Sequence, residues 1–170
     1  TCLLANCSSL AARTSSIVML LDTLDGSSSC SDASLDSWLE VNADGSVTIF
    51  SGKIEMGQGI GTALIQIVAE ELDMRVERVR VMAGDTSRTP DEGGTGGSRS
   101  VKNSGSALRS AAAEARQFLL QLAAEQLGLP LSQLEVDDGT IRPRGKKTPS
   151  LSYGRLFGGR RFQRVATGKA

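Results

Sequence analysis

The stretch GQGIGT, which begins at Gly57, carries the first residues suited to ligand binding. It lies between a predicted strand and a predicted helix, where free backbone N–H groups and the helix dipole favour an anionic or polar group. Gln58 adds a side-chain amide between Gly57 and Gly59. The stretch fails the dinucleotide fingerprint, because Thr62 and Leu64 stand where glycine is required, and no P-loop lysine and hydroxyl pair follows it. A tight strand-to-helix turn explains these glycines equally well.

A second stretch, GGTGGSRS at residues 93–100, combines flexible amides with hydroxyls just before a strong helix. This composition is expected where a backbone nest holds phosphate, although solvated linkers share it. Its candidate ligand-binding residues are Thr95, Gly96, Gly97, Ser98 and Ser100. Because both stretches precede helices in one small domain, we expect their N–H groups to converge on one elongated anion.

The composition excludes several classes of function. Lysine plus arginine and aspartate plus glutamate balance at 19 each, so no overall charge would hold the chain on nucleic acid or an anionic membrane. The absence of histidine removes self-contained serine-histidine or cysteine-histidine catalysis. Cys2, Cys7 and Cys30 match no zinc or iron-sulfur spacing, so we assign no metal ligand and no catalytic residue.

The elements that position the two stretches can be predicted from periodicity. Alternating residues 38–42 and 47–51 flank the turn Asp44-Gly45 and predict a hairpin. Apolar residues recur at helical spacing from Leu64 to Leu72, and residues 76–82 alternate as a strand.

A long irregular region, residues 84–105, precedes the strongest helix of the sequence. That helix spans residues 106–127, with Ser104 or Ser106 as N-cap and Gly128 as its stop. Residues 134–136 and 140–142 predict a last strand pair. Together these elements predict an α+β fold with a small mixed sheet and two main helices.

The chain length favours one domain, over residues 35–159. Residues 1–34 are predicted to be a leader or flexible linker, and residues 160–170 a junction to a following domain. The apolar run 17–21 is too short to span a bilayer, so we predict no membrane span. The compartment, cytoplasmic or periplasmic, stays open.

Several motifs in order resemble one known family, the molybdenum hydroxylases (xanthine dehydrogenase and aldehyde oxidase). The resemblance covers residues 38–159 and looks closest to bacterial large subunits of the isoquinoline 1-oxidoreductase beta and nicotinate dehydrogenase type. The motifs, with the residue at which each begins, are GKIEMGQG at Gly52, TA at Thr62, IVAEEL at Ile67, GDT at Gly84, TP at Thr89 and TGGSRS at Thr95.

The resemblance implies a molybdopterin cofactor with molybdenum, in bacteria often as the cytosine dinucleotide. By position, Gln58 between its glycines would hydrogen-bond the pterin. Thr95, Ser98 and Ser100, with nearby amides, would hold the pyrophosphate side, and Gly97 would lie close to the oxo and hydroxo ligands of the metal. The small residues at positions 96 and 97 suit a backbone that approaches a cofactor closely.

The family hydroxylates aldehydes or N-heterocycles with water, using a glutamate in a distant motif that this chain lacks; Glu55 is not its counterpart. The resemblance therefore implies an N-terminal fragment that is not active alone. Its implied partners are the remainder of the large subunit and a small subunit with two [2Fe-2S] clusters. The alternatives are a non-catalytic packing or interaction module and a nucleotide or flavin phosphate-binding domain.

Overall fold

The computed structural model describes residues 34–167, and its first sheet holds three strands in the order β1-β2-β3. The strands are β1 (Leu39–Val41), β2 (Val47–Ser51) and β3 (Val79–Ala83). β1 pairs antiparallel with β2, and β2 pairs parallel with β3. The predicted hairpin is confirmed, and the left-handed Gly45 (φ 82°) allows its tight turn.

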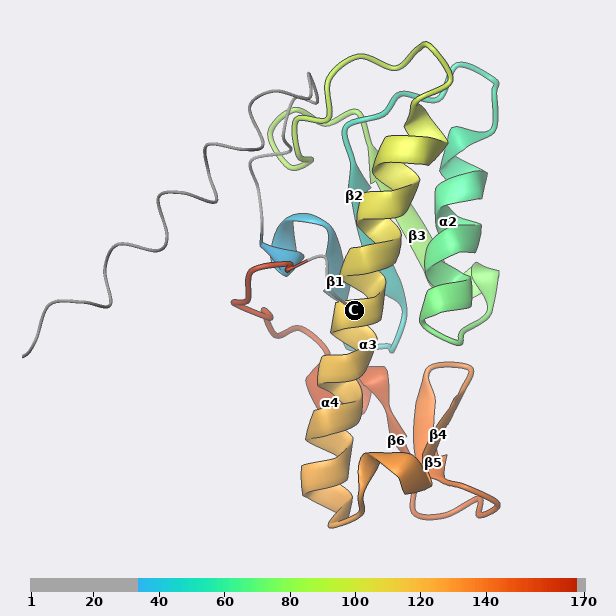
Figure 1. The fold of residues 1–170 in the computed structure, drawn as a ribbon, viewed down its shortest axis with the longest axis vertical. Coiled ribbons are helices and arrows are strands. Elements are labelled where there is room, and N and C mark those ends of the chain that lie inside the picture. Colours follow the sequence, from blue (N-terminus) through green and yellow to red (C-terminus); the bar gives the residue numbers. More distant parts are fainter. Residues whose placement is uncertain (1–33, 168–170) are drawn as a thin grey trace, which may run out of the picture.

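Two helices, α2 (Ile60–Glu71) and α3 (Ser106–Leu127), lie side by side over this sheet (Figure 1). Because β2 and β3 run parallel, their carboxyl ends meet at one edge of the sheet. Residues 52–59, which follow β2, and residues 84–99, which follow β3, therefore leave from the same edge. Both segments stand at the top of Figure 1, where the two helices begin. We call these segments the first loop and the second loop.

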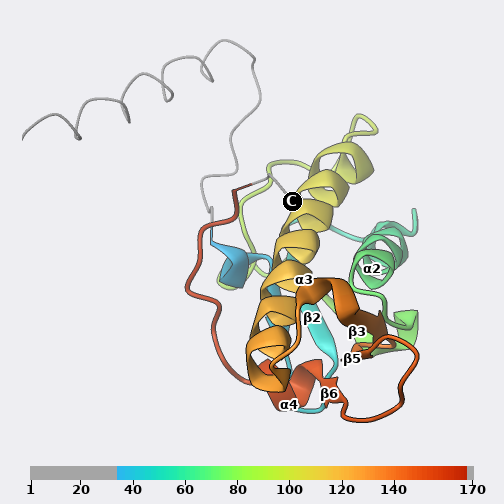
Figure 2. The ribbon, with the colours of Figure 1, turned by 60° about the horizontal axis from the view of Figure 1, so that its bottom comes forward.

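A second sheet, which is entirely antiparallel, lies at the other end of α3 (Figures 1 and 2). It contains β4 (Leu134–Asp137), β5 (Thr140–Pro143) and β6 (Leu151–Ser152), and α4 (Tyr153–Phe157) follows directly. The predicted pair of strands is confirmed by β4 and β5. β6 and α4 were not predicted, because two strand residues and one helical turn carry no periodicity.

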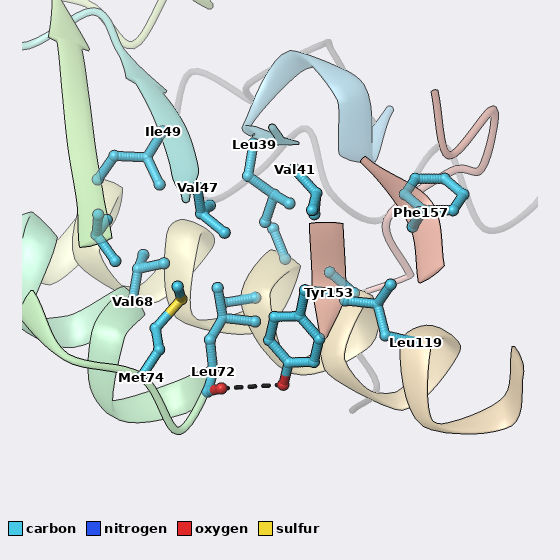
Figure 3. Packing of buried hydrophobic residues seen from close by; sticks show 14 of the residues in the cluster. Leu39, Val41, Val47, Ile49, Val68, Leu72, Met74, Leu119, Tyr153 and Phe157 are labelled. Atoms are coloured by element: carbon cyan, nitrogen blue, oxygen red, sulfur yellow. Dashed lines mark hydrogen bonds between the residues drawn. The ribbon is translucent and has the colours of Figure 1, made fainter. Parts of the chain in front are cut away.

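One apolar core joins the first sheet, both helices and the second sheet. Figure 3 shows Tyr153 from α4 reaching across this core, where its hydroxyl donates a hydrogen bond to the Leu72 carbonyl at 3.0 Å. Burial raises the pKa of the Tyr153 phenol well above its usual value. This bond ties α4, which directly follows the second sheet, to the end of α2.

One predicted boundary and one predicted cap are wrong, whereas the predicted bounds of α3 are confirmed. Residues 76–78 form the 3-10 turn η3 (Val76–Arg78), so the strand begins only at Val79. Neither Ser104 nor Ser106 caps α3, because the π-helical turn η4 (Val101–Gly105) runs directly into it. A Cβ at Gly105 would lie 2.9 Å from Ile67 Cδ1, so the glycine lets this turn pack against α2. Packing, rather than a polar cap, decides where the helix begins.

The described C-terminal segment folds back onto the domain. The Asp36 carboxylate accepts hydrogen bonds from the N–H groups of Phe162 (2.6 Å) and Gln163 (2.8 Å), and Ser34 bridges Val165. Residues 1–33, which contain the three cysteines and nearly all of the predicted leader or linker, lie outside the described residues, as do residues 168–170. Within the described part, no helix has the length and apolar character that a bilayer crossing requires.

Candidate functional site

The two loops enclose one cavity of about 610 Å³, a size usual for small-molecule sites. We call it the interloop cavity. Its lining residues come from both loops and from the first turns that follow them: Met56, Gln58, Gly59, Ile60, Ala63, Thr95, Gly96, Ser98, Ser100 and Val101. The structure thus brings together most of the residues singled out from the sequence, whereas Gly57 and Gly97 do not line the cavity.

The amides at the start of α2 are held by the chain's own anion, Glu55. Its carboxylate accepts from the N–H groups of Gly57 (2.8 Å), Gly59 (2.9 Å) and Gly61 (3.1 Å). These hydrogen bonds lower the pKa of the Glu55 carboxyl, and the bond from Gly59 has the largest effect. The expectation that these amides would receive an external anion is therefore corrected.

Gln58 braces the first loop while lining the cavity. Its Oε1 accepts from the Met56 N–H at 2.6 Å, and its Nε2 donates to the Ile54 carbonyl at 2.9 Å. A primary amide has two N–H donors and two acceptor positions, so one of each stays available to a ligand.

The second loop supplies hydroxyls. Ser98 and Ser100 make no side-chain hydrogen bond with any residue in the described range, and both line the cavity. Ser98 has φ 56°, a left-handed conformation that is uncommon outside glycine, and it follows Gly97 at φ 64°. Thr95 Oγ1 accepts from the Ile54 N–H at 2.9 Å, which leaves its own proton free to donate.

Two charged residues that the sequence analysis missed join the loops. Lys53 is only 3% exposed, and its ammonium donates to the carbonyls of Glu92 (2.6 Å), Gly93 (3.4 Å) and Gly94 (3.2 Å). The Glu92 carboxylate accepts from Ser51 Oγ (2.6 Å) and from the Gly52 N–H (2.7 Å). Partners about 40 positions apart leave no periodic signal in one sequence.

The cavity combines these polar groups with an apolar side. Ile60 is buried at its wall, while Met56 and Val101 are 70% and 51% exposed at it. None of the lining residues is charged. The site therefore suits a ligand with a flat or apolar body and several hydrogen-bonding edges.

Comparison with known proteins identifies the family. A family model described as the molybdopterin cofactor-binding domain matches residues 12–167. One subunit of the nicotinate dehydrogenase of Pseudomonas putida is 44% identical over 126 residues, which are 74% of this chain and 10% of that protein. The beta subunit of the isoquinoline 1-oxidoreductase of Brevundimonas diminuta is 39% identical over 142 residues, which are 79% of this chain and 18% of that protein.

Solved structures agree with this match. Reconstituted CO dehydrogenase from Oligotropha carboxidovorans superposes with a TM-score of 0.61 at 30% identity, over 69% of this chain and 15% of that chain. Quinoline 2-oxidoreductase from Pseudomonas putida 86 shares the fold, with a TM-score of 0.59 at 23% identity. The chain thus spans less than a fifth of the length of the proteins it matches. Because the family model covers most of its residues, the chain belongs to the molybdopterin cofactor-binding family of the molybdenum hydroxylases.

Proposed function

We propose that this chain is the cofactor-binding portion of a molybdenum-dependent oxidoreductase that hydroxylates aldehydes or N-heterocycles with water. The observation that supports this function is the interloop cavity, where the Gln58 amide and the Ser98 and Ser100 hydroxyls face one space. The names of the matched relatives, nicotinate dehydrogenase and isoquinoline 1-oxidoreductase, favour an N-heterocycle as substrate.

The donor set of the cavity fits molybdopterin. The free amide positions of Gln58 would bond the pterin edge, and Thr95, Ser98 and Ser100 would bond the pyrophosphate side. At Gly59 and Gly96 an added Cβ would meet no atom within 4 Å, so the backbone there borders open space that a cofactor could occupy. When bound, the molybdenum centre would supply the two-electron oxidation that a hydroxylation with water needs.

The finer assignments belong to the same proposal. The cofactor would be the cytosine dinucleotide form, and Gly97 would lie near the metal. The remainder of the large subunit would supply the catalytic glutamate, and a small iron-sulfur subunit would carry the electrons away. The partial coverage of the relatives supports a larger assembly, since 10% and 18% of their lengths are matched.

The test is the molybdenum and pterin content of the enzyme purified with its natural partners. The sharpest variant is Ser98→Ala combined with Ser100→Ala, because these hydroxyls have no internal partner among the described residues. Losing bonds to a phosphate should lower pterin retention about tenfold. Ser132→Ala is the matched control, an exposed serine beside the second sheet.

Gln58→Ala should also lower retention, but it additionally removes two bonds within the first loop. A wild-type complex without stoichiometric molybdenum would favour the alternative of a non-catalytic packing module. Full pterin retention in the double serine variant would reject the assignment of these residues.

A further inference from the structure

Lys53 is a buried cation whose ammonium finds its hydrogen-bond partners in the second loop. Its side chain is 3% exposed, and within residues 34–167 it makes no ion pair. Burying an ammonium without an anionic partner is unfavourable, so its three N–H donors must find other acceptors. They find the three consecutive carbonyls of residues 92–94. The position of the backbone at residues 92–94 therefore depends on the position of the Lys53 ammonium.

Three other contacts join the second loop to the end of β2 and to the first loop. The Glu92 carboxylate bonds Ser51 and the Gly52 N–H, and Thr95 Oγ1 accepts from the Ile54 N–H. A Cβ at Gly52 would lie 2.4 Å from the Pro90 carbonyl oxygen, so this approach requires glycine. The residues directly after β2 thus hold residues 90–95 through several independent contacts.

We propose that Lys53 and Glu92, which we call the loop clamp, position the second loop for the cofactor before the cofactor binds. Lys53 does not line the interloop cavity, so it is a positioning residue that acts through the loop backbone. The path from its partner Gly94 to the hydroxyls of Ser98 and Ser100 is four to six residues of chain. The proposal rests on the proposed function, because it assigns a role within the same cofactor site.

The clamp matters because residues 91–99 are mostly exposed and bury little surface of their own. Its composition of glycine, serine and threonine cannot form a core, and Gly93 and Gly94 have open space at their Cβ positions. The bond from the Gly93 N–H to Asp91 is local. Without the clamp, ordering the loop would have to accompany cofactor binding and would weaken it.

The experiment uses the full assembled enzyme with Lys53→Met, which keeps a long side chain but removes the donors. Lys147→Met, at an exposed lysine between β5 and β6, is the control. The first readout is amide hydrogen exchange of residues 91–100 in enzyme from a host that cannot make molybdopterin. The second is the rate of pterin loss from the loaded enzyme, measured beside the turnover per molybdenum retained.

We expect Lys53→Met to speed exchange in residues 91–100 and pterin loss by about tenfold each, the usual effect of losing bonds to a charged group. Turnover per retained molybdenum and exchange in the second half of α3 should match the control. Unchanged exchange in the loop would overturn the proposal, as would a fall in turnover per molybdenum without faster pterin loss.

Glu92→Gln provides a second test if Lys53→Met unfolds the enzyme. It leaves the backbone carbonyls in place and weakens only the bonds to Ser51 and Gly52. Faster loop exchange with an intact α3 would support the clamp, and wild-type exchange would overturn it. Absence of pterin from the wild-type enzyme would instead reject the proposed function, and the cofactor-free exchange would still decide the clamp.

Discussion

Replacing Gly52 by alanine should push the two loops apart. Its added Cβ would lie 2.4 Å from the Pro90 oxygen and 3.3 Å from the Glu92 nitrogen. Both are backbone atoms, so no side-chain rotation relieves the overlap. Gly52 is not among the residues with positive φ, and alanine can therefore adopt its backbone conformation. The effect of the variant is purely steric.

The size of the effect follows from the overlap. Ordinary contact begins near 3.4 Å, so the Pro90 carbonyl would have to retreat by about 1 Å. Overpacking of this kind costs about 1 to 3 kcal/mol. For a chain of this length each kcal/mol lowers Tm by about 2 to 4 °C, which gives a decrease of about 2 to 12 °C.

The assay is thermal unfolding of the full chain, to which this Tm range applies, together with pterin retention in the enzyme assembled with its natural partners. Gly94→Ala is the matched control, because its Cβ would meet no atom within 4 Å and its φ is not positive. Its stability should change by less than about 0.5 kcal/mol. If Gly52→Ala had the Tm and pterin retention of Gly94→Ala, the close approach of the loops would be wrong.

Three further predictions concern single polar groups. Glu55 has a lowered pKa, so its contribution to the start of α2 is complete above its ordinary value of 4.5 and is lost as the pH falls through the lowered value. Protection of the N–H groups of Gly57 and Gly59 from exchange should therefore drop on acidification in the wild type, whereas Glu55→Gln should lack this pH dependence. Tyr153→Phe should lower the free energy of unfolding by about 1 kcal/mol, since the Leu72 carbonyl loses its donor; an unchanged value in denaturant titration would contradict this. Ser104→Ala should leave stability unchanged or raise it by up to about 1 kcal/mol, because the buried hydroxyl has no partner among the described residues; a clear loss would show a partner that the geometry lacks.

Short-range patterns explain how much of the fold could be predicted. Leu39 and Val41 are buried and Glu40 is exposed, as strict alternation along a strand predicts. Gly128 ends α3 at φ 64°, as the position of a glycine after a long helical run predicts. In both cases the signal depends on neighbours within a few residues, and tertiary contacts agree with it.

Long-range contacts explain what could not be predicted. The two-residue strand β6 exists only because β5 pairs with it. The bounds predicted for α3 are confirmed, but its predicted serine cap is wrong. A π-helical turn that packs on α2 precedes the helix, whereas a serine cap requires a local hydrogen bond. In each case the deciding partner is set by the fold and not by the adjacent residues.

The candidate site divides in the same way. The amino-acid sequence alone determined the family and the two loops, because glycines and hydroxyl side chains before helices are local features. Most of the residues predicted from the sequence line one cavity. Tertiary structure decided how the polar groups are used: Glu55 holds the amides at the start of α2, and Lys53 holds the backbone of the second loop. The physical reason is that a charged group forms hydrogen bonds with whichever donors or acceptors the fold brings close to it. The residue types alone do not specify which groups these will be.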